Sequence, residues 1–208
     1  LLAAMLPMMV AVCISLWLTS QQTLKSSLKL AENEINTISG QLNTYLNQRL
    51  TEITLYARTP QLRTQPFEDS LGYLESEQEN YQDIYEKFIL GLPNGHFLNT
   101  RGGNPHQHFI RTFNDNNAEA KPKSIQQRDY WEVTIGLNNR ASSIQYVSNP
   151  MISFTTGVRQ IVVSSSILDT EGKIKGLLGG ALPWESIKGL LDRIFSQVQQ
   201  RFPHAKLA

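Results

Sequence analysis

A long stretch without helix breakers constrains this chain more than any other feature. From Gln21 to about Thr59 the sequence contains no proline and one glycine, Gly40. Apolar or small residues recur along it in steps of three and four, at Leu24, Leu28, Ala31, Ile35, Ile38, Leu42, Leu46, Leu50, Ile53 and Ala57. These steps place the side chains on one stripe of a helix, with a local slip in the heptad pattern around Leu46. The sequence therefore predicts one long helix over residues 21–59.

This helix is expected to end at Thr59-Pro60, because a residue that precedes proline is disfavoured in the helical conformation. At 1.5 Å per residue the helix would be roughly 55–60 Å long. One small domain cannot cover a stripe of that length. We expect part of the stripe to pack on the body of its own chain and the remainder to pair with a second copy in a homodimer. The alternative is that the whole stripe packs on its own chain.

The residues before this stripe form an apolar run. No charged residue precedes Lys25, and Trp17 stands near the end of the nearly all-apolar residues 1–18. A membrane span needs about 20 such residues, and Pro7 is tolerated in a membrane helix. A signal peptide is the alternative, but the segment after Trp17, Leu-Thr-Ser-Gln-Gln, has no Ala-x-Ala pattern. We predict a transmembrane helix over residues 1–20, in a chain that is a piece of a longer protein.

Composition and charge narrow the classes of partner. The formal net charge is +1 and the sequence pI is about 8.0, so no broad basic field supports nucleic-acid binding. A hydrophobic content of 40% with 18% charged residues is ordinary for a packed domain. Cys13 is the single cysteine and lies in the apolar run, so we interpret it as a small hydrophobic side chain.

Beyond Pro60 the pattern changes to short β-type segments. Strands are predicted at Tyr85–Leu92, His96–Asn99, Phe109–Phe113, Ser143–Val147, Val158–Leu168 and Lys173–Leu182. Turn residues at Pro93-Asn94-Gly95 and Asp169-Thr170-Glu171-Gly172 join two of these pairs as hairpins. Helices are predicted at Glu68–Glu79, at Glu132–Leu137 and from Pro183 onwards. Helices, then mostly antiparallel strands, then a helix indicate an α+β domain.

The segment Gln127-Arg128-Asp129-Tyr130-Trp131 is the candidate binding element. It places a guanidinium beside two large aromatic side chains. Arginine offers five donors in a rigid fork that fits a carboxylate, and Tyr and Trp each add a flat apolar surface with one polar atom. This set of groups suits a small anionic ligand. The alternative is a surface salt bridge of Arg128 beside two core aromatics.

Catalytic and metal-binding patterns are not found in the sequence. His106 and His108 have no third His or Cys nearby, so we expect solvated histidines rather than a metal site. The glycines of Gly176–Gly180 lack the Lys-Ser/Thr of a phosphate loop, and no Gly-x-Ser-x-Gly elbow occurs. Glu77 and Glu79 lie in an acidic, polar run. We expect no enzyme, metal or cofactor in this segment.

The order of these elements resembles the membrane-distal half of double Cache (dCache) sensor domains. These are extracytoplasmic ligand-binding regions of bacterial chemoreceptors, sensor histidine kinases and diguanylate cyclases. The similarity covers about residues 21–208 and is most specific from Arg128 to Ala181, through Asn149-Pro150, Thr156-Gly157 and Asp169…Gly172…Gly176…Gly179. It implies a PAS-like antiparallel sheet with the long helix packed on it, in a module over residues 60–198. Residues 199–208 are similar to the start of a second, membrane-proximal module, and the sensor would lie on the extracytoplasmic side of the plasma membrane.

The resemblance also implies a site. In amino-acid-binding members an Arg-x-Trp-Tyr element holds the ligand carboxylate, and Arg128, Tyr130 and Trp131 match it with the aromatic pair in swapped order. Those members also carry a Tyr and an Asp after the equivalent of Pro150, and a further Asp that holds the ligand amine. Here these three positions are Met151, Ser153 and Ala181.

An α-amino acid would therefore place its ammonium without a counter-charge. We expect a small ligand with a carboxylate or similar acceptor and no amine. The site residues we expect are Arg128, Tyr130, Trp131, Tyr146, Asn149 and Ser153.

The sequence is compatible with three functions. The first is the small-molecule sensing module of a membrane receptor, which passes its signal through the long helix to a cytoplasmic effector. The second is a ligand-free structural, dimerisation or partner-binding module, in which Arg128 and its aromatics have structural roles. The third, an anchored enzyme, has no catalytic constellation to support it.

Overall fold

The computed structural model of the chain describes the backbone of residues 2–101, 124–136 and 142–201. Within residues 14–196 it also describes the side chains, except those of Ala31 and of residues 102–123 and 137–141. The chain divides into two compact units, Leu1–Asn43 with Ile194–Ala208 and Thr44–Arg193. Helix α1 spans Leu2–Ala57 without interruption, so the predicted long helix is confirmed and ends two residues before Thr59. The second unit contains the whole sheet and the candidate site.

The part of α1 in the first unit exposes apolar side chains. Leu24, Leu28 and Ile35 of the predicted stripe are 57%, 61% and 64% exposed. Within the region whose side chains are described, no helix has both the length and the apolar character needed to span a membrane. The side chains of residues 2–13, which form most of the predicted anchor, lie outside that region.

Two short helices connect α1 to the sheet. Pro60 does more than end α1, because it also begins helix α2, Pro60–Thr64, which the sequence analysis did not predict. Proline suits this first helical position because its missing N–H has no partner there in any case. Helix α3, Phe67–Asn80, matches the predicted helix and buries Phe67, Leu71 and Leu74.

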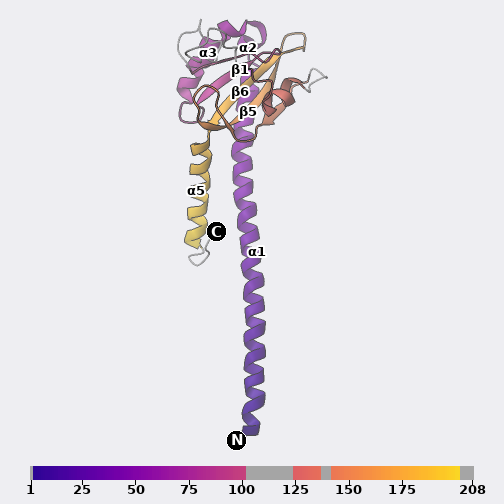
Figure 1. The fold of residues 1–208 in the computed structure, drawn as a ribbon, viewed down its shortest axis with the longest axis vertical. Helices are drawn as coiled ribbons and strands as arrows, with labels where there is room; N and C mark the ends of the chain where they lie inside the picture. Colours follow the sequence, from indigo (N-terminus) through magenta and orange to yellow (C-terminus); the bar gives the residue numbers. More distant parts are fainter. Residues whose placement is uncertain (1, 102–123, 137–141, 202–208) are drawn as a thin grey trace, which may run out of the picture. The chain divides into compact units, whose positions relative to one another are not determined.

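A six-stranded antiparallel sheet forms the body of the second unit. Its strands are β1 Lys87–Gly91, β2 Phe97–Asn99, β3 Gln145–Val147, β4 Met151–Ile152, β5 Arg159–Leu168 and β6 Ile174–Pro183. The strand order is β2-β1-β6-β5-β3, with β4 also paired to β5. Figure 1 labels the three central strands β1, β6 and β5. The α+β fold and the strands predicted within the described residues are confirmed, while the short strand β4 was not predicted.

The two faces of the sheet pack against different partners. On one face, a β-carbon built on Gly180 would lie 2.6 Å from Tyr85 Cε1 and 2.7 Å from Ile53 Cδ1 of α1. On the other face, Ile89, Val162, Leu177 and Ala181 form a buried cluster with Phe97, Ile125 and Tyr130. Side chains alternate between the faces of a strand, so Gly180 and Ala181 of β6 face α1 and the opposite cluster respectively. The long helix is thus packed on the sheet through its last turns.

The tip of the β5–β6 hairpin is bound to α2 in both directions. Arg63 of α2 donates from Nε to Leu168 O at 3.2 Å and from Nη2 to Asp169 O at 3.0 Å. In return, Lys175 of β6 donates from Nζ to Leu62 O at 2.6 Å and also to Gln65 O. These charge-assisted bonds fix the tip of the hairpin against α2.

The remaining elements correct two predictions. Helix α4, Asp129–Trp131, continues into a π-helical turn, η2 Glu132–Gly136, where the sequence analysis placed one short helix. Pro183 pairs with Gln160 as the last residue of β6, and helix α5 begins one residue later and spans Trp184–Arg201. Proline tolerates the end of a strand because no further ladder bond requires its N–H. The predicted strand at Phe109–Phe113 and most of the predicted second-module segment 199–208 lie outside the described residues.

Candidate functional site

The turn between β1 and β2 positions the segment that carries Arg128. Gly95 has φ of 79°, which favours glycine, and a β-carbon there would lie 2.5 Å from Ser124 Oγ. Its carbonyl accepts from Ile125 N at 2.9 Å, and Arg128 N donates to Ile125 O at 2.9 Å. On the other side of Arg128, Trp131 donates from Nε1 to Leu92 O at 3.0 Å. Both ends of the Arg128 segment are therefore attached to one turn.

Asp129 ties the same segment to the connection between β3 and β4. Its Oδ1 accepts from Tyr130 N at 2.8 Å at the start of α4. Its Oδ2 accepts from Asn149 N at 2.7 Å and from the Tyr146 hydroxyl at 3.4 Å. Asp129 is a site-framing residue that was not predicted, although it lies in the N-terminal turn of a helix, where a carboxylate is favourable.

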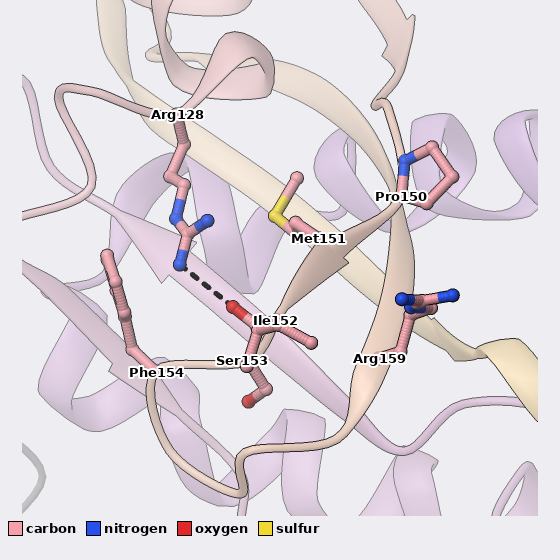
Figure 2. A pocket seen from close by; sticks show the side chains of 7 residues that line it. All are labelled: Arg128, Pro150, Met151, Ile152, Ser153, Phe154 and Arg159. Carbon is pink, nitrogen blue, oxygen red and sulfur yellow. Dashed lines mark hydrogen bonds between the residues drawn. The ribbon is translucent and has the colours of Figure 1, made fainter.

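The Arg128 guanidinium lies over β4 and the loop that follows it. Its Nη2 donates to Ile152 O at 2.9 Å, and its Cζ lies 3.7 Å from the centroid of the Phe154 ring (Figure 2). No carboxylate pairs with Arg128 among the described ion pairs, so the surface salt bridge considered from the sequence is not the arrangement observed. Guanidinium groups carry five donors, and the bond to Ile152 uses one of them.

Two adjoining spaces lie beside Arg128. The outer one is an open cleft of about 730 Å³ lined by Arg128, Pro150, Met151, Ile152, Ser153, Phe154 and Arg159. Figure 2 shows Arg128 and Arg159 on either side of the Met151–Ile152 strand in that view. The inner one is a recess of about 10 Å³, which is close to the space that one water molecule requires. Met151, Ser153 and Phe154, together with Arg128, line both spaces.

The six predicted site residues divide into two groups. Arg128 and Ser153 line both spaces, and Tyr130 lines the recess with 3% of its surface exposed. Burial raises the pKa of the Tyr130 hydroxyl. By contrast, Trp131 and Tyr146 pack beside the apolar cluster, and the described bond of Asn149 to Asp129 comes from its backbone N–H. These three residues line neither space, so their assignment as ligand contacts stays a prediction.

Lys87 of β1 is the site residue that the sequence analysis missed. Its side chain is 2% exposed, lines the recess and donates from Nζ to Ser153 Oγ at 2.5 Å. Burial lowers the pKa of Lys87 to about 8, although Glu86 opposes the shift. The strand pattern could have shown it, because Lys87 occupies the same face of β1 as Ile89 and a charged residue on a buried face is exceptional.

The lining of the two spaces has one sign of charge. Arg128 and Arg159 line the cleft, Arg128 and Lys87 line the recess, and no acidic residue is among the described residues that line either. The remaining polar groups of the recess are the side chains of Ser153, Thr155, Gln160 and Tyr130. Chemically, this arrangement can bind an anion and offers no counter-charge to an ammonium.

The described residues contain no group of three His, Cys, Asp or Glu side chains placed to hold a metal ion. His106 and His108, which we expected to be solvated, lie outside the described residues.

Comparison with known proteins gives a match at the level of structure. No protein-family model and no curated protein matches the sequence. The ligand-binding domain of the Pseudomonas fluorescens chemoreceptor CtaA in complex with L-serine matches with a TM-score of 0.59 and 18% identity, over 80% of this chain and 63% of that chain. The sensory domain of the Campylobacter jejuni chemoreceptor Tlp3 with isoleucine bound matches with a TM-score of 0.52 and 20% identity, over 82% of this chain and 63% of that chain.

These matches show that the chain has the fold of chemoreceptor ligand-binding domains, the fold class that the resemblance to Cache sensor domains implied. A second Tlp3 structure, in complex with L-valine, matches with a TM-score of 0.53 and 19% identity, over 82% of this chain and 64% of that chain. The chain thus spans less than two thirds of the length of these solved domains.

Proposed function

We propose that the chain is the small-molecule sensing module of a membrane-anchored receptor and that its ligand binds in the cleft beside Arg128. The observation that carries this proposal is the lining of the cleft and recess, where Arg128, Arg159 and Lys87 meet no acidic residue among the described lining residues. Lys87 has Glu86 Oε2 at 3.9 Å, but half-buried Arg128 has no carboxylate among the described ion pairs, and such a cation is costly unless an anion pairs with it. A fold used by ligand-binding domains of receptors supports the same function.

The ligand class we propose is a small metabolite with a carboxylate or a similar acceptor and no amine. The crystallised CtaA and Tlp3 domains named above hold amino acids. In this chain an amino acid would bring its ammonium among cationic side chains, since Ser153 and Ala181 stand where the resemblance to amino-acid-binding members implies aspartates. The penalty for an unpaired ammonium in a desolvated site is several kcal/mol.

Arg128 would act as the carboxylate clamp. One of its donors is committed to Ile152 O, and the stacked Phe154 ring holds the guanidinium plane in place. A guanidinium oriented in this way can offer two parallel N–H groups to a carboxylate, which gives both affinity and geometric selection. Arg159, on the same cleft, adds a second positive charge at the entrance.

A thermal-shift and calorimetry screen over small organic acids tests this proposal. We expect at least one acid to stabilise the protein, and we expect Arg128→Met to weaken that acid at least tenfold. Arg58→Met, which removes an exposed arginine of the α1–α2 connection, is the matched control and should leave binding unchanged. If Arg128→Met leaves every binding response intact, the pocket assignment is wrong.

Signal transfer would use the packing of the sheet on α1. Ile53 of α1 and Tyr85 both press against Gly180 of β6, and the neighbouring Ala181 faces the apolar cluster under the recess. Closure of the cleft around a ligand would shift β6 and with it the last turns of α1, which biases a two-state element. We propose that α1 carries this shift to a cytoplasmic effector, which in this class of receptor is a chemoreceptor signalling domain, a histidine kinase or a diguanylate cyclase.

We further propose that residues 1–20 anchor the module in the plasma membrane with the sensor on the periplasmic side, and that α1 pairs with a second copy. The exposed apolar side chains of Leu24, Leu28 and Ile35 support the pairing, because an apolar stripe in water favours burial against a partner. Analytical ultracentrifugation in detergent would measure it. Leu28→Glu with Ile35→Glu should shift the protein to monomer, whereas Thr37→Glu, an exposed polar site on α1, should not.

One observation favours a second function, a ligand-free structural or partner-binding module. The recess of about 10 Å³ is nearly filled by side chains, so the innermost part of the site has no preformed room for an organic molecule. Under this alternative the acid screen gives no response, and Arg128→Met lowers the free energy of unfolding without any effect on binding.

A further inference from the structure

Lys87 of β1 is a buried lysine with one described side-chain hydrogen bond. Its ammonium reaches 2.5 Å from Ser153 Oγ, and both side chains are almost fully buried. An ammonium has three N–H donors, and among the described residues Ser153 is the acceptor within hydrogen-bond distance. Lysine is almost never fully buried unless it is paired, so its remaining donors call for another acceptor.

Glu86 balances this charge only in part. Its Oε2 lies 3.9 Å from Lys87 Nζ, which is beyond hydrogen-bond distance, and it accepts no hydrogen bond from any described residue. Its Oε1 is committed to Arg101 Nη1 at 3.2 Å. The single carboxylate of Glu86 is therefore shared by two cations, Lys87 and Arg101. The net charge of these three groups beside the recess is positive.

Lys87 and Arg128 lie close enough to hold one small molecule. Arg128 bonds to the carbonyl of Ile152 and Lys87 to the side chain of Ser153, which is the next residue. Two hydrogen bonds and one residue of extended chain separate the two cationic groups, so the distance between them is at most about 10 Å. Both side chains line the same recess.

A narrow wall separates Lys87 from the open cleft. Ser153 and Phe154 line both spaces and begin the turn that Gly157 N closes on Ser153 O at 3.1 Å. Phe154 is 37% exposed, so it lies at the surface rather than in the core. Ser153 Oγ also accepts from Thr155 N at 3.2 Å and Thr156 N at 3.1 Å, so this turn is the part of the chain that lies between the cleft and the Lys87 ammonium.

The recess contains a further group in need of a partner. Gln160 is 3% exposed, and its side-chain oxygen accepts no hydrogen bond from any described residue. A buried polar group without a partner costs stability, so such groups mark places where a ligand or water completes the structure. Gln160 lies on β5 opposite the end of β6, in the wall of the same recess as Lys87.

We propose that Lys87 is the second anchor of the site and that the ligand carries two anionic groups, one for Arg128 and one for Lys87, as in a short-chain dicarboxylate. This inference rests on the proposed function and specifies its ligand class. Lys87 also gives a physical reason for the exclusion of amines. Lys87 of β1 pairs in register with Ala181 of β6, the position where amino-acid-binding members are expected to hold the ligand amine. The ammonium of Lys87 therefore occupies the region that a ligand ammonium would need.

The test compares acids of equal chain length with one or two carboxylates, namely butyrate against succinate and valerate against glutarate, by calorimetry at pH 7. We expect the better diacid to bind the native protein at least tenfold more tightly than its monoacid. Lys87→Met keeps the length of the side chain and removes its charge. In this variant we expect the preference for the diacid to fall below threefold, while the affinity of the monoacid changes less than twofold.

Proton uptake provides a second readout that a purely structural lysine would not move. At pH 8, near the pKa of about 8 for Lys87, the ammonium is about half protonated in the free protein. A bound dianion raises that pKa, so binding should take up as much as half a proton, measured by calorimetry in buffers of different ionisation enthalpy. The uptake should vanish in Lys87→Met, whose fold is checked by circular dichroism.

The outcomes separate the two proposals. If monoacids and diacids bind equally well, or if Lys87→Met keeps the preference for diacids, the second anchor is wrong and the Arg128 site remains. If no acid of either kind binds to the native protein, the proposed function itself is wrong. If Lys87→Met fails to fold, Lys87→Arg takes its place in the test. This variant keeps the positive charge, so it should keep the preference for diacids. It should lose the proton uptake at pH 8, because arginine does not titrate there.

Discussion

The ring of Tyr85 lies so close to the backbone of Gly180 that a β-carbon on the glycine would stand 2.6 Å from ring atom Cε1. The Tyr85 hydroxyl in turn donates to Glu52 Oε2 of α1 at 2.9 Å, and Arg49 pairs with Glu52 at 2.8 Å. Glycine is thus required where the sheet meets the long helix, because any side chain would push Tyr85 away from α1.

Gly180→Ala should therefore destabilise the protein. Overpacking a rigid core costs about 1–3 kcal/mol, and we expect that loss in the free energy of unfolding measured with urea. Gly72→Ala is the matched control, since Gly72 is exposed on helix α3 and nothing lies within 4 Å of a β-carbon there. That control should be neutral or stabilise by up to about 1 kcal/mol. Equal effects of the two substitutions would contradict the close contact.

Trp131→Phe should separate structure from binding. The substitution removes the hydrogen bond to Leu92 O, whose carbonyl still accepts from Gly95 N at 2.9 Å, so the cost should be about 1 kcal/mol. Trp131 lines neither the cleft nor the recess, so the affinity for any acid that binds should change less than twofold. A tenfold loss of affinity in calorimetry would place Trp131 in the site after all.

Asp129→Asn should weaken the framework that holds Arg128. The amide keeps one oxygen for Tyr130 N but places N–H groups where Oδ2 accepts from Asn149 N at 2.7 Å. Hydrogen bonds to a charged group contribute about 1.5–3 kcal/mol, and we expect a loss of that order in thermal or urea unfolding. Glu132→Gln removes an exposed carboxylate on the same segment and should leave stability unchanged.

Lys87 should make stability rise with pH in a defined window. Its pKa is about 8 in the folded protein, below the ordinary value of 10.5, so the unfolded chain binds more protons between these pH values. The free energy of unfolding should accordingly rise by about 2 kcal/mol from pH 8 to pH 10. Burial raises the pKa of Tyr85 and Tyr130, so stability should fall again above pH 10 as the tyrosines of the unfolded chain ionise.

Lys87→Met isolates this contribution. Urea unfolding at pH 8 and pH 10 should show the rise in the native protein and little or none in the variant. Glu86 and Arg101 are the charged groups that face the same ammonium, and both are kept in the variant. An equal rise in both proteins would assign the effect to another group.

Much of the fold could be predicted from the sequence because its signals are local. The stripe from Leu24 to Ala57 repeats for ten positions, and the β5–β6 hairpin has a clear turn at Asp169–Gly172. Helix α2 and strand β4 were missed because five and two residues are too short to establish a period. Their formation depends on partners distant in sequence, such as the bonds of Arg63 to the hairpin tip.

The candidate site was predictable only where charge and motif coincide. Arg128 and Ser153 were predicted and do line the cleft. They could be predicted because their segments carry recognisable turn and aromatic residues. The neighbours of Arg128 divide in a way that no spacing reveals, since Tyr130 faces the recess while Trp131 reaches back to Leu92. The alternation of β1 marks Lys87 as a charged residue on a buried face, but its place beside the site comes from contacts with residues far away in the sequence, such as Ser153 and Ala181.

The bonds between α2 and the tip of the β5–β6 hairpin have a mechanical consequence. Arg63 and Lys175 hold the tip on one side, while Arg159, Gln160 and Ala181 lie at the opposite, site-facing end of strands ten residues long. A body that is fixed at one end and pushed at the other rotates rather than slides. Ligand-driven motion of this hairpin should therefore be a pivot about α2, with its largest displacement at the end of β6 that contacts α1.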